Sequence, residues 1–106
     1  MDGCTPALAA SEKNMGEPLA LFCTAITDDC RIRPAHISLY VALLDAWRLQ
    51  AYDAPVRISR GQVMKTAKFS SRATYNNAVN ELHEYGYIIY LPSPDPRVKS
   101  RVWLVF

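Results

Sequence analysis

The sequence has few cysteines and none of the motifs that mark a metal centre or a catalytic site. Its three cysteines, Cys4, Cys23 and Cys30, are odd in number and stand at no metal-ligand spacing from one another or from a histidine. Reduced thiols that bind no metal are therefore expected. The chain also lacks a glycine-rich phosphate loop, an HExxH motif and a nucleophile arrangement near His36 or His83. These absences predict a protein that is not an enzyme and uses no cofactor.

Long hydrophobic runs are absent as well. No apolar stretch approaches the roughly 20 residues that a membrane-spanning helix needs, and the first residues do not combine a basic region with an apolar one. We therefore expect a cytoplasmic protein that enters no membrane. At 106 residues the chain suffices for one compact domain and is too short for two. Its residues are 50% hydrophobic and 21% charged, which is typical of a folded domain.

The charged residues are divided unevenly along the chain. Up to Val56 there are four basic and seven acidic residues, whereas from Arg57 onward there are eight basic and three acidic ones. This asymmetry predicts that the second half of the chain meets an anionic partner.

Residues 1–16 are small and polar and contain a proline, which indicates a flexible N-terminal tail ahead of a domain at residues 17–106. The domain is expected to begin with a short amphipathic helix that ends near Asp28. Its predicted apolar face consists of Leu19, Phe22, Cys23 and Ile26.

A longer helix is expected within residues 33–52, where the apolar pattern is strongest. Its predicted stripe consists of Ile37, Tyr40, Val41, Leu44 and Trp47, with Leu39 and Leu43 widening it. We expect this helix to form the centre of the core, packed on two sides, with its aromatic side chains as core filling.

The second half is expected to alternate short strands with short helices. Residues 56–59 alternate as a strand does, and Ser59 with Gln62 forms a capping-box pattern that starts a helix at about Arg60. Another helix is expected at residues 72–85, between a serine cap and a helix-ending glycine. Its buried stripe would be Tyr75, Ala78, Val79 and Leu82, and Phe69 just before it would insert into the core. Two further strands, at residues 87–91 and 101–106, frame a proline-rich basic connector.

This order of elements, together with "HISLYVALL", "SRATYNNAVNELHEYGYI" and "PSPDPRVKSRVWL", resembles the winged helix-turn-helix superfamily from about Pro34 to Phe106. Within it the chain is most similar to small winged-helix proteins and to replication or regulatory factors of bacterial mobile elements and plasmids. The resemblance implies a single, mainly α domain with a small β-hairpin wing (α+β) that binds double-stranded DNA. The helix at residues 17–28 is an addition to the minimal fold.

In the helix-turn-helix mode the second helix of the pair lies in the major groove, so the helix at residues 72–85 would read the DNA. With its apolar stripe turned inward, its outward positions carry asparagines rather than simple charges. An amide both donates and accepts hydrogen bonds, so asparagine can pair with adenine, as arginine can with guanine. The residues predicted to read bases are Arg72, Asn76, Asn77 and Asn80, with contact to a phosphate as the alternative for Arg72.

Phosphate contacts are expected from hydroxyls beside the free N–H groups at the start of this helix and from basic residues around it. Three basic residues on the outgoing side of the wing alternate in sequence, so a strand would point them to one face. The residues predicted to contact phosphates are Arg60, Lys65, Lys68, Ser70, Ser71, Thr74, Arg97, Lys99 and Arg101.

Other interpretations remain open at this point. The asparagines could belong to a solvated helix face, and the basic wing could be a charged hairpin that keeps the protein soluble. A winged helix can also serve protein contact, since fold does not determine function. The helix at residues 17–28 and the acidic first half would then form a homodimer surface or dock a replication or recombination partner. No small-molecule ligand is indicated.

Overall fold

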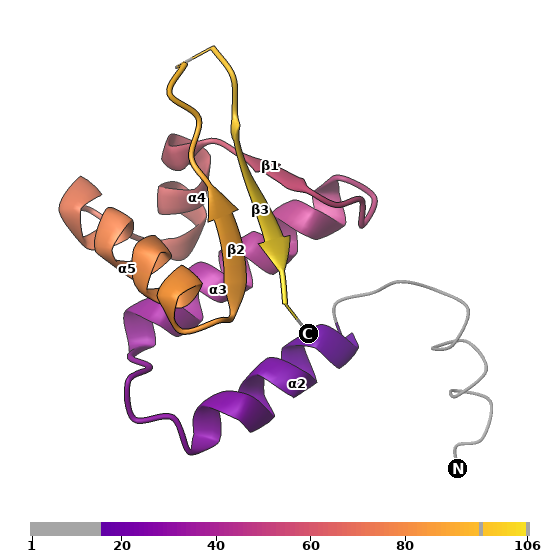
Figure 1. Ribbon diagram of the computed structural model, residues 1–106, viewed down its shortest axis with the longest axis vertical. Helices are drawn as coiled ribbons and strands as arrows, with labels where there is room; N and C mark the ends of the chain where they lie inside the picture. The colour runs from indigo at the N-terminus through magenta and orange to yellow at the C-terminus, as the bar shows by residue number, and fades with distance from the viewer. Residues whose placement is uncertain (1–15, 96, 106) are drawn as a thin grey trace.

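Four helices and three short strands form a single α+β domain in the part of the chain that the structure describes (Figure 1). The computed structural model describes residues 16–95 and 97–105. The predicted tail and Cys4 therefore lie outside the described residues, apart from Gly16, which begins the first helix. That helix, α2 (Gly16–Thr27), is followed in order by α3 (Pro34–Leu49), β1 (Val56–Ile58), α4 (Arg60–Ala67), α5 (Arg72–Glu84), β2 (Ile88–Leu91) and β3 (Ser100–Leu104).

Helix α2 packs on α3 through aromatic rings. The ring of Phe22 stacks on that of Tyr40 with 3.8 Å between centroids, and it meets Tyr87 edge-on at 5.4 Å. Cys23 was predicted to share this apolar face, but its side chain is exposed, whereas Pro18 is buried. Leu19 and Ile26 are partly buried against the core, as predicted. The buried direction is set by Pro18, Phe22 and Ile26, which lie four residues apart, so Cys23 falls at the edge of this face and is exposed.

Helix α3 is the centre of the core, as predicted, but its buried face is rotated from the predicted stripe. Leu39, Leu43 and Tyr40 are almost fully buried, whereas Ile37 and Val41 are 39% and 46% exposed. Because α4, α5 and β1 all pack on α3, the side that these three elements share is covered most completely. Ile37 and Val41 were therefore wrongly assigned to the core.

The boundaries of α4 and α5 follow from local chemistry, and the predictions for them are confirmed. Ser59 accepts a hydrogen bond from the N–H of Gln62 at 3.4 Å, and Ser71 accepts one from the N–H of Thr74 at 3.3 Å. The return bond of the predicted capping box, from the Gln62 side chain, is not formed within the described residues. Gly86 follows α5 with a φ of 89°, in the left-handed region that glycine adopts without a steric penalty.

The stripe of α5 is also confirmed, since Tyr75, Ala78, Val79 and Leu82 are all buried. Phe69, in the α4–α5 turn, is half-buried and meets the ring of Tyr75 edge-on at 6.0 Å between centroids.

The sheet is antiparallel and has the order β1-β3-β2. The β2–β3 hairpin is therefore not a separate unit, because β1 joins it with Val56 paired to Val102 and Arg57 paired to Arg101. Burial of the β1 side chains Val56 and Ile58 against the core holds β1 there. The described residues of the β2–β3 connection, 92–95 and 97–99, project beyond the helices (Figure 1).

Asp29 links the α2–α3 connection to the turn after α5. Its carboxylate accepts bonds from the guanidinium of Arg31 at 2.9 Å and from the hydroxyl of Tyr87 at 2.7 Å. The guanidinium also lies 4.3 Å from the ring centroid of Tyr85. The bond from Arg31, and then that from Tyr87, holds the pKa of Asp29 well below its usual range. Burial, and then the bond to Asp29, raises the pKa of Tyr87 to about 12.

Candidate nucleic-acid interface

The outward face of α5 carries polar side chains that bond to no other group in the described part of the chain. Because the apolar stripe of α5 faces the core, Arg72, Asn76, Asn77 and Asn80 are all exposed. Within the described residues none of these four side chains forms a hydrogen bond or an ion pair. Each can therefore donate or accept a bond to an outside group without breaking a bond of the fold.

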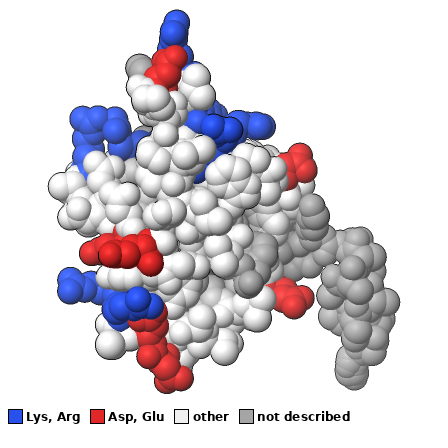
Figure 2. Space-filling view, viewed as in Figure 1, with Lys and Arg blue, Asp and Glu red and all other residues white. Residues whose placement is uncertain are grey.

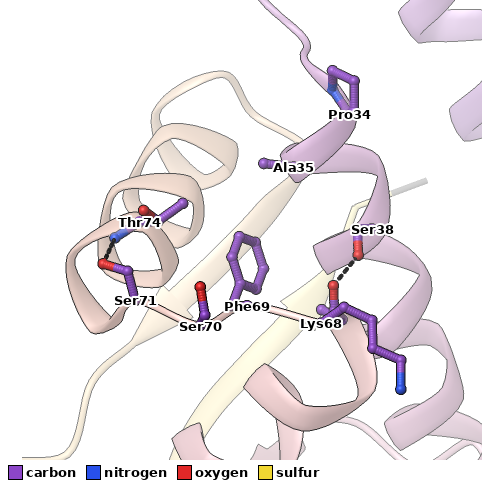
Figure 3. A pocket seen from close by; sticks show the side chains of 9 residues that line it. Pro34, Ala35, Ser38, Lys68, Phe69, Ser70, Ser71 and Thr74 are labelled. Carbon is purple, nitrogen blue, oxygen red and sulfur yellow. Dashed lines mark hydrogen bonds between the residues drawn. The ribbon is translucent and has the colours of Figure 1, made fainter.

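The start of α5 borders an open hollow of about 360 Å³ against the start of α3 (Figure 3). Four predicted phosphate-contacting residues line it: Lys68, Ser70, Ser71 and Thr74. Ser71 already caps the helix, so its oxygen is engaged while its hydroxyl proton remains free to donate. The hydroxyl of Ser38 donates to the carbonyl of Ala67 and ties this turn to α3.

Asn77 and Thr74 also line a second hollow, of about 200 Å³, beside Arg33, His36 and Glu81 of the α3–α5 junction. Asn77 therefore lies toward α3 on the exposed face. The carboxylate of Glu81 and the guanidinium of Arg33 line the same hollow, so the charge near Asn77 is mixed, whereas Asn76 and Asn80 do not line this hollow.

His36 holds this junction together, a role that no motif in the sequence indicated. The residue is 2% exposed, its Nδ1 accepts the N–H of Arg33 at 2.9 Å, and its Nε2 lies 2.8 Å from Oε1 of Glu81. Because Nδ1 accepts, Nε2 carries the proton and donates it to the carboxylate. This bond fixes α5 against the start of α3. The spacing of His36 from Leu39, Tyr40 and Leu43 could have indicated its burial.

Arg60 and Lys99 line a hollow of about 390 Å³ between the start of α4 and the β2–β3 connection. Two distant parts of the predicted site are thus brought together. The predicted alternation of the basic residues is wrong, however, because β3 begins only at Ser100 and the chain turns at residues 97 and 98. Arg97 bends back to Asp95, with Nη2 and Oδ2 3.3 Å apart, and its bonds lower the pKa of that carboxyl.

Arg57 was not predicted from the sequence to be a site residue, because it belongs to neither α4 nor the β2–β3 hairpin. The register places it directly opposite Arg101 on neighbouring strands, and both side chains are exposed. Its backbone N–H and carbonyl are bonded to the side chain of Gln50, so the arginines form a non-hydrogen-bonded pair with Cα atoms about 4.5 Å apart. Two like charges this close repel each other unless an anion lies between or beside them.

The basic residues of the two halves of the chain differ in how often they form ion pairs. Arg31 and Arg48 are paired with Asp29 and Asp45. Arg33 has no carboxylate partner among the described residues. In the second half, all basic side chains but Arg97 lack such a partner among the described residues; these are Arg57, Arg60, Lys65, Lys68, Arg72, Lys99 and Arg101. On the face seen in Figure 2, several Lys and Arg side chains lie toward the end that bears the β2–β3 connection, and others lie at the opposite end beside Asp and Glu.

Comparison with protein-family models, curated proteins and solved structures finds no match to this chain. Among residues 16–95 and 97–105 there is no group of three metal-binding side chains. No helix in the same part of the chain is long and apolar enough to cross a membrane. The exposed basic and amide groups are thus the main chemical feature from which a function can be inferred.

Proposed function

We propose that this protein is a winged helix-turn-helix protein that binds double-stranded DNA in a sequence-specific manner and acts as a transcriptional or mobile-element regulator. Helices α4 and α5 would be the helix-turn-helix pair, and the β2–β3 connection would be the wing. The element order, the antiparallel sheet that includes β1, and the position of α3 behind the pair support this assignment.

The observation that carries the proposal is the set of unpaired side chains around the start of α5. Exposed side chains can be solvated by water, but Arg72, Asn76 and Asn80 lie on one helix face close to unpaired cations, so amides and positive charges are presented together. A duplex supplies base edges for the amides and phosphates for the cations, so a single ligand matches both.

In this arrangement α5 would enter the major groove with Arg72 and Asn76 toward the bases. Ser70, Ser71 and Thr74 would donate to a phosphate at the start of the helix, where the partial positive charge of the helix end also attracts an anion. Lys99 and Arg101 would follow the backbone on the wing side, with Arg57 beside them. Each neutralised phosphate releases counterions, so binding must weaken as salt rises.

The test is selection of bound duplexes from random-sequence DNA, followed by titration of the recovered pool at two salt concentrations. An enriched motif whose affinity falls with salt is the expected result. Salt-dependent binding without a motif would remove the base-reading role and leave a non-specific DNA binder. Absence of both would favour the alternative, a winged helix that docks a protein in a replication or recombination complex.

A further inference from the structure

The outer face of the sheet carries apolar side chains together with two arginines. Side chains alternate along a strand, so every second residue of β2 and β3 points away from the core. The register places Ile89 beside Trp103 on this outer face. In the next row, Leu91, Arg101 and Arg57 lie side by side on β2, β3 and β1. These five residues form the surface that we call the outer sheet face.

The apolar members of the outer sheet face are accessible to solvent. Ile89 and Leu91 are 50% and 46% exposed, and Trp103 between the neighbouring strands is half-buried. Single exposed apolar side chains are common on proteins, but several that lie next to one another on a small domain mark a contact surface.

A ligand of this sheet is directed to its face, because side chains occupy its two outer edges. On β1, the side chain of Gln50 bonds both the N–H and the carbonyl of Arg57, at 3.0 and 2.7 Å. On β2, Nδ1 of His83 accepts the N–H of Tyr90 at 3.0 Å. An extended peptide that added a strand would need these backbone groups. Side chains of the outer sheet face must therefore make the contacts.

The two arginines indicate the charge of the ligand. Arg57 and Arg101 are both exposed, stand opposite each other on neighbouring strands and have no carboxylate partner among the described residues. Like charges directly opposite each other destabilise a sheet. A phosphate between or beside the two guanidinium groups removes this repulsion, whereas a purely apolar partner leaves it uncompensated. The pair thus favours an anionic ligand.

The spacing of charged and aromatic side chains fits a nucleotide. Arg101 and Trp103 are two residues apart on β3, which is about 7 Å, a separation that one nucleotide spans between its phosphate and its base. A base can then stack on the ring of Trp103, beside Ile89, while its phosphate meets the arginines. Neighbouring base pairs cover the faces of the bases in a duplex, so only an unpaired strand offers them for stacking.

We infer that the outer sheet face binds single-stranded DNA, with Trp103 as the stacking surface and with Arg57 and Arg101 as the phosphate contacts. The choice of DNA rests on the proposed function, because Arg101 also borders the proposed duplex interface on the side of the β2–β3 connection. A strand that leaves the bound duplex at this connection then continues over the sheet.

The test is fluorescence anisotropy of a labelled oligothymidylate of about ten nucleotides, within the usual site size of such surfaces. The full chain is titrated without duplex DNA. We expect binding accompanied by quenching of tryptophan emission, which reports Trp103 because Trp47 is only 8% exposed. Trp103→Ala should weaken binding at least about fivefold, the lower end of the loss of one base–aromatic stack. Trp103→Phe should restore most of this loss.

Salt titration of the same strand tests the arginines. Arg57→Ala should flatten the plot of log affinity against log salt by about 0.7, the value of one phosphate contact on a single strand. Arg48→Ala is the matched control, because Arg48 is already paired with Asp45 on α3, and it should leave the slope unchanged. An unchanged slope for Arg57→Ala would overturn the arginine contacts.

A substitution of an exposed side chain tests the face without disturbing the core. Ile89→Glu should weaken binding of the strand at least about fivefold, since it places a carboxylate beside the stacked base. Val41→Glu, on α3, alters a side chain of similar exposure and should have no such effect.

Three results would overturn the inference. One is affinity for an oligoglutamate of equal charge that matches the affinity for the strand, which would show that charge alone acts. The second is wild-type binding by both Trp103→Ala and Ile89→Glu. The third is a dimer in sedimentation equilibrium that Ile89→Glu abolishes, which would assign the face to a second copy of the chain. Because no duplex is present, failure to select a duplex motif would leave these results unchanged.

Discussion

At the scale of single residues, Asn76 is the clearest candidate for reading a base. It is exposed one helical turn after Arg72, and it does not share the hollow in which Asn77 faces Glu81. Asn76→Ala should reduce discrimination at one base pair of the selected motif by about 1–3 kcal/mol, the value of a bidentate pair. The salt dependence of DNA binding should be the same in this variant as in the wild type, because an amide neutralises no phosphate. Titration of the selected site and of single-base variants at two salt concentrations measures both quantities.

The contrasting substitution is Lys65→Ala, which removes an exposed cation from α4. It should weaken all sequences alike and flatten the plot of log affinity against log salt by about one unit. If Asn76→Ala behaves like Lys65→Ala, Asn76 does not read a base.

The bonds to Asp29 make the free energy of unfolding dependent on pH in the acidic range. Its folded-state pKa is depressed below the ordinary 3.8, first by the bond from Arg31 and then by that from Tyr87. The stabilisation is therefore complete above about pH 4 and is lost as pH falls further, toward the still lower folded pKa. Asp29→Asn should lower the free energy of unfolding at pH 7 and flatten its decline below about pH 4. Urea titrations at pH 7 and at several values below pH 4 provide the measurement.

Asp28→Asn is the matched control for this substitution, because the Asp28 side chain forms no hydrogen bond or ion pair within the described residues. Asp95, whose pKa is also lowered, is present in both variants and contributes equally. Wild-type stability of the Asp29→Asn variant at pH 7 would show that the Asp29 contacts are energetically neutral.

At the scale of elements, Gly61 and Gly86 allow two effects of a glycine-to-alanine substitution to be distinguished: backbone strain and steric overlap. An added Cβ would meet no atom within 4 Å at either Gly61 or Gly86, but only Gly86 has a positive φ, of 89°. Gly86→Ala should therefore cost about 1–2 kcal/mol, the penalty for an L-residue in the left-handed region. Gly61→Ala, inside α4, should stabilise by about 0.5–1 kcal/mol. Urea unfolding of both variants checks the signs, and equal effects would contradict this account.

Predictions for elements succeeded where the signal lies within a few residues. The cap at Ser59, the end of α5 before Gly86 and the four-residue stripe of α5 were predicted correctly, and of the two serines considered for the cap of α5, Ser70 and Ser71, the structure uses Ser71. The stripe of α3 was not, because α3 is apolar around much of its circumference. Periodicity then cannot tell which side its neighbours cover, and Ile37 and Val41 were assigned to the wrong side.

At the scale of the whole molecule, the proposed interface predicts how binding depends on salt. Lys99→Ala and Arg101→Ala should each flatten the slope by about one unit, since each removes one phosphate contact. Arg97→Ala should change it less, because Arg97 is already paired with Asp95. Arg48→Ala, which removes the partner of Asp45 on α3, is the control and should leave the slope unchanged. If all four variants show the same salt slope, the β2–β3 connection does not contact the DNA.

The sequence alone determined the local features of this protein: where helices start and stop, which side of α5 is buried, and the cationic character of the second half. These features depend on neighbouring residues and on helical periodicity, which the sequence shows directly. Only the tertiary structure decided the pairing of β1 with β3, which sets Arg57 beside Arg101, and the bond that joins His36 to Glu81 across 45 positions. Such contacts join segments far apart in the chain, and no local pattern specifies which segments will meet.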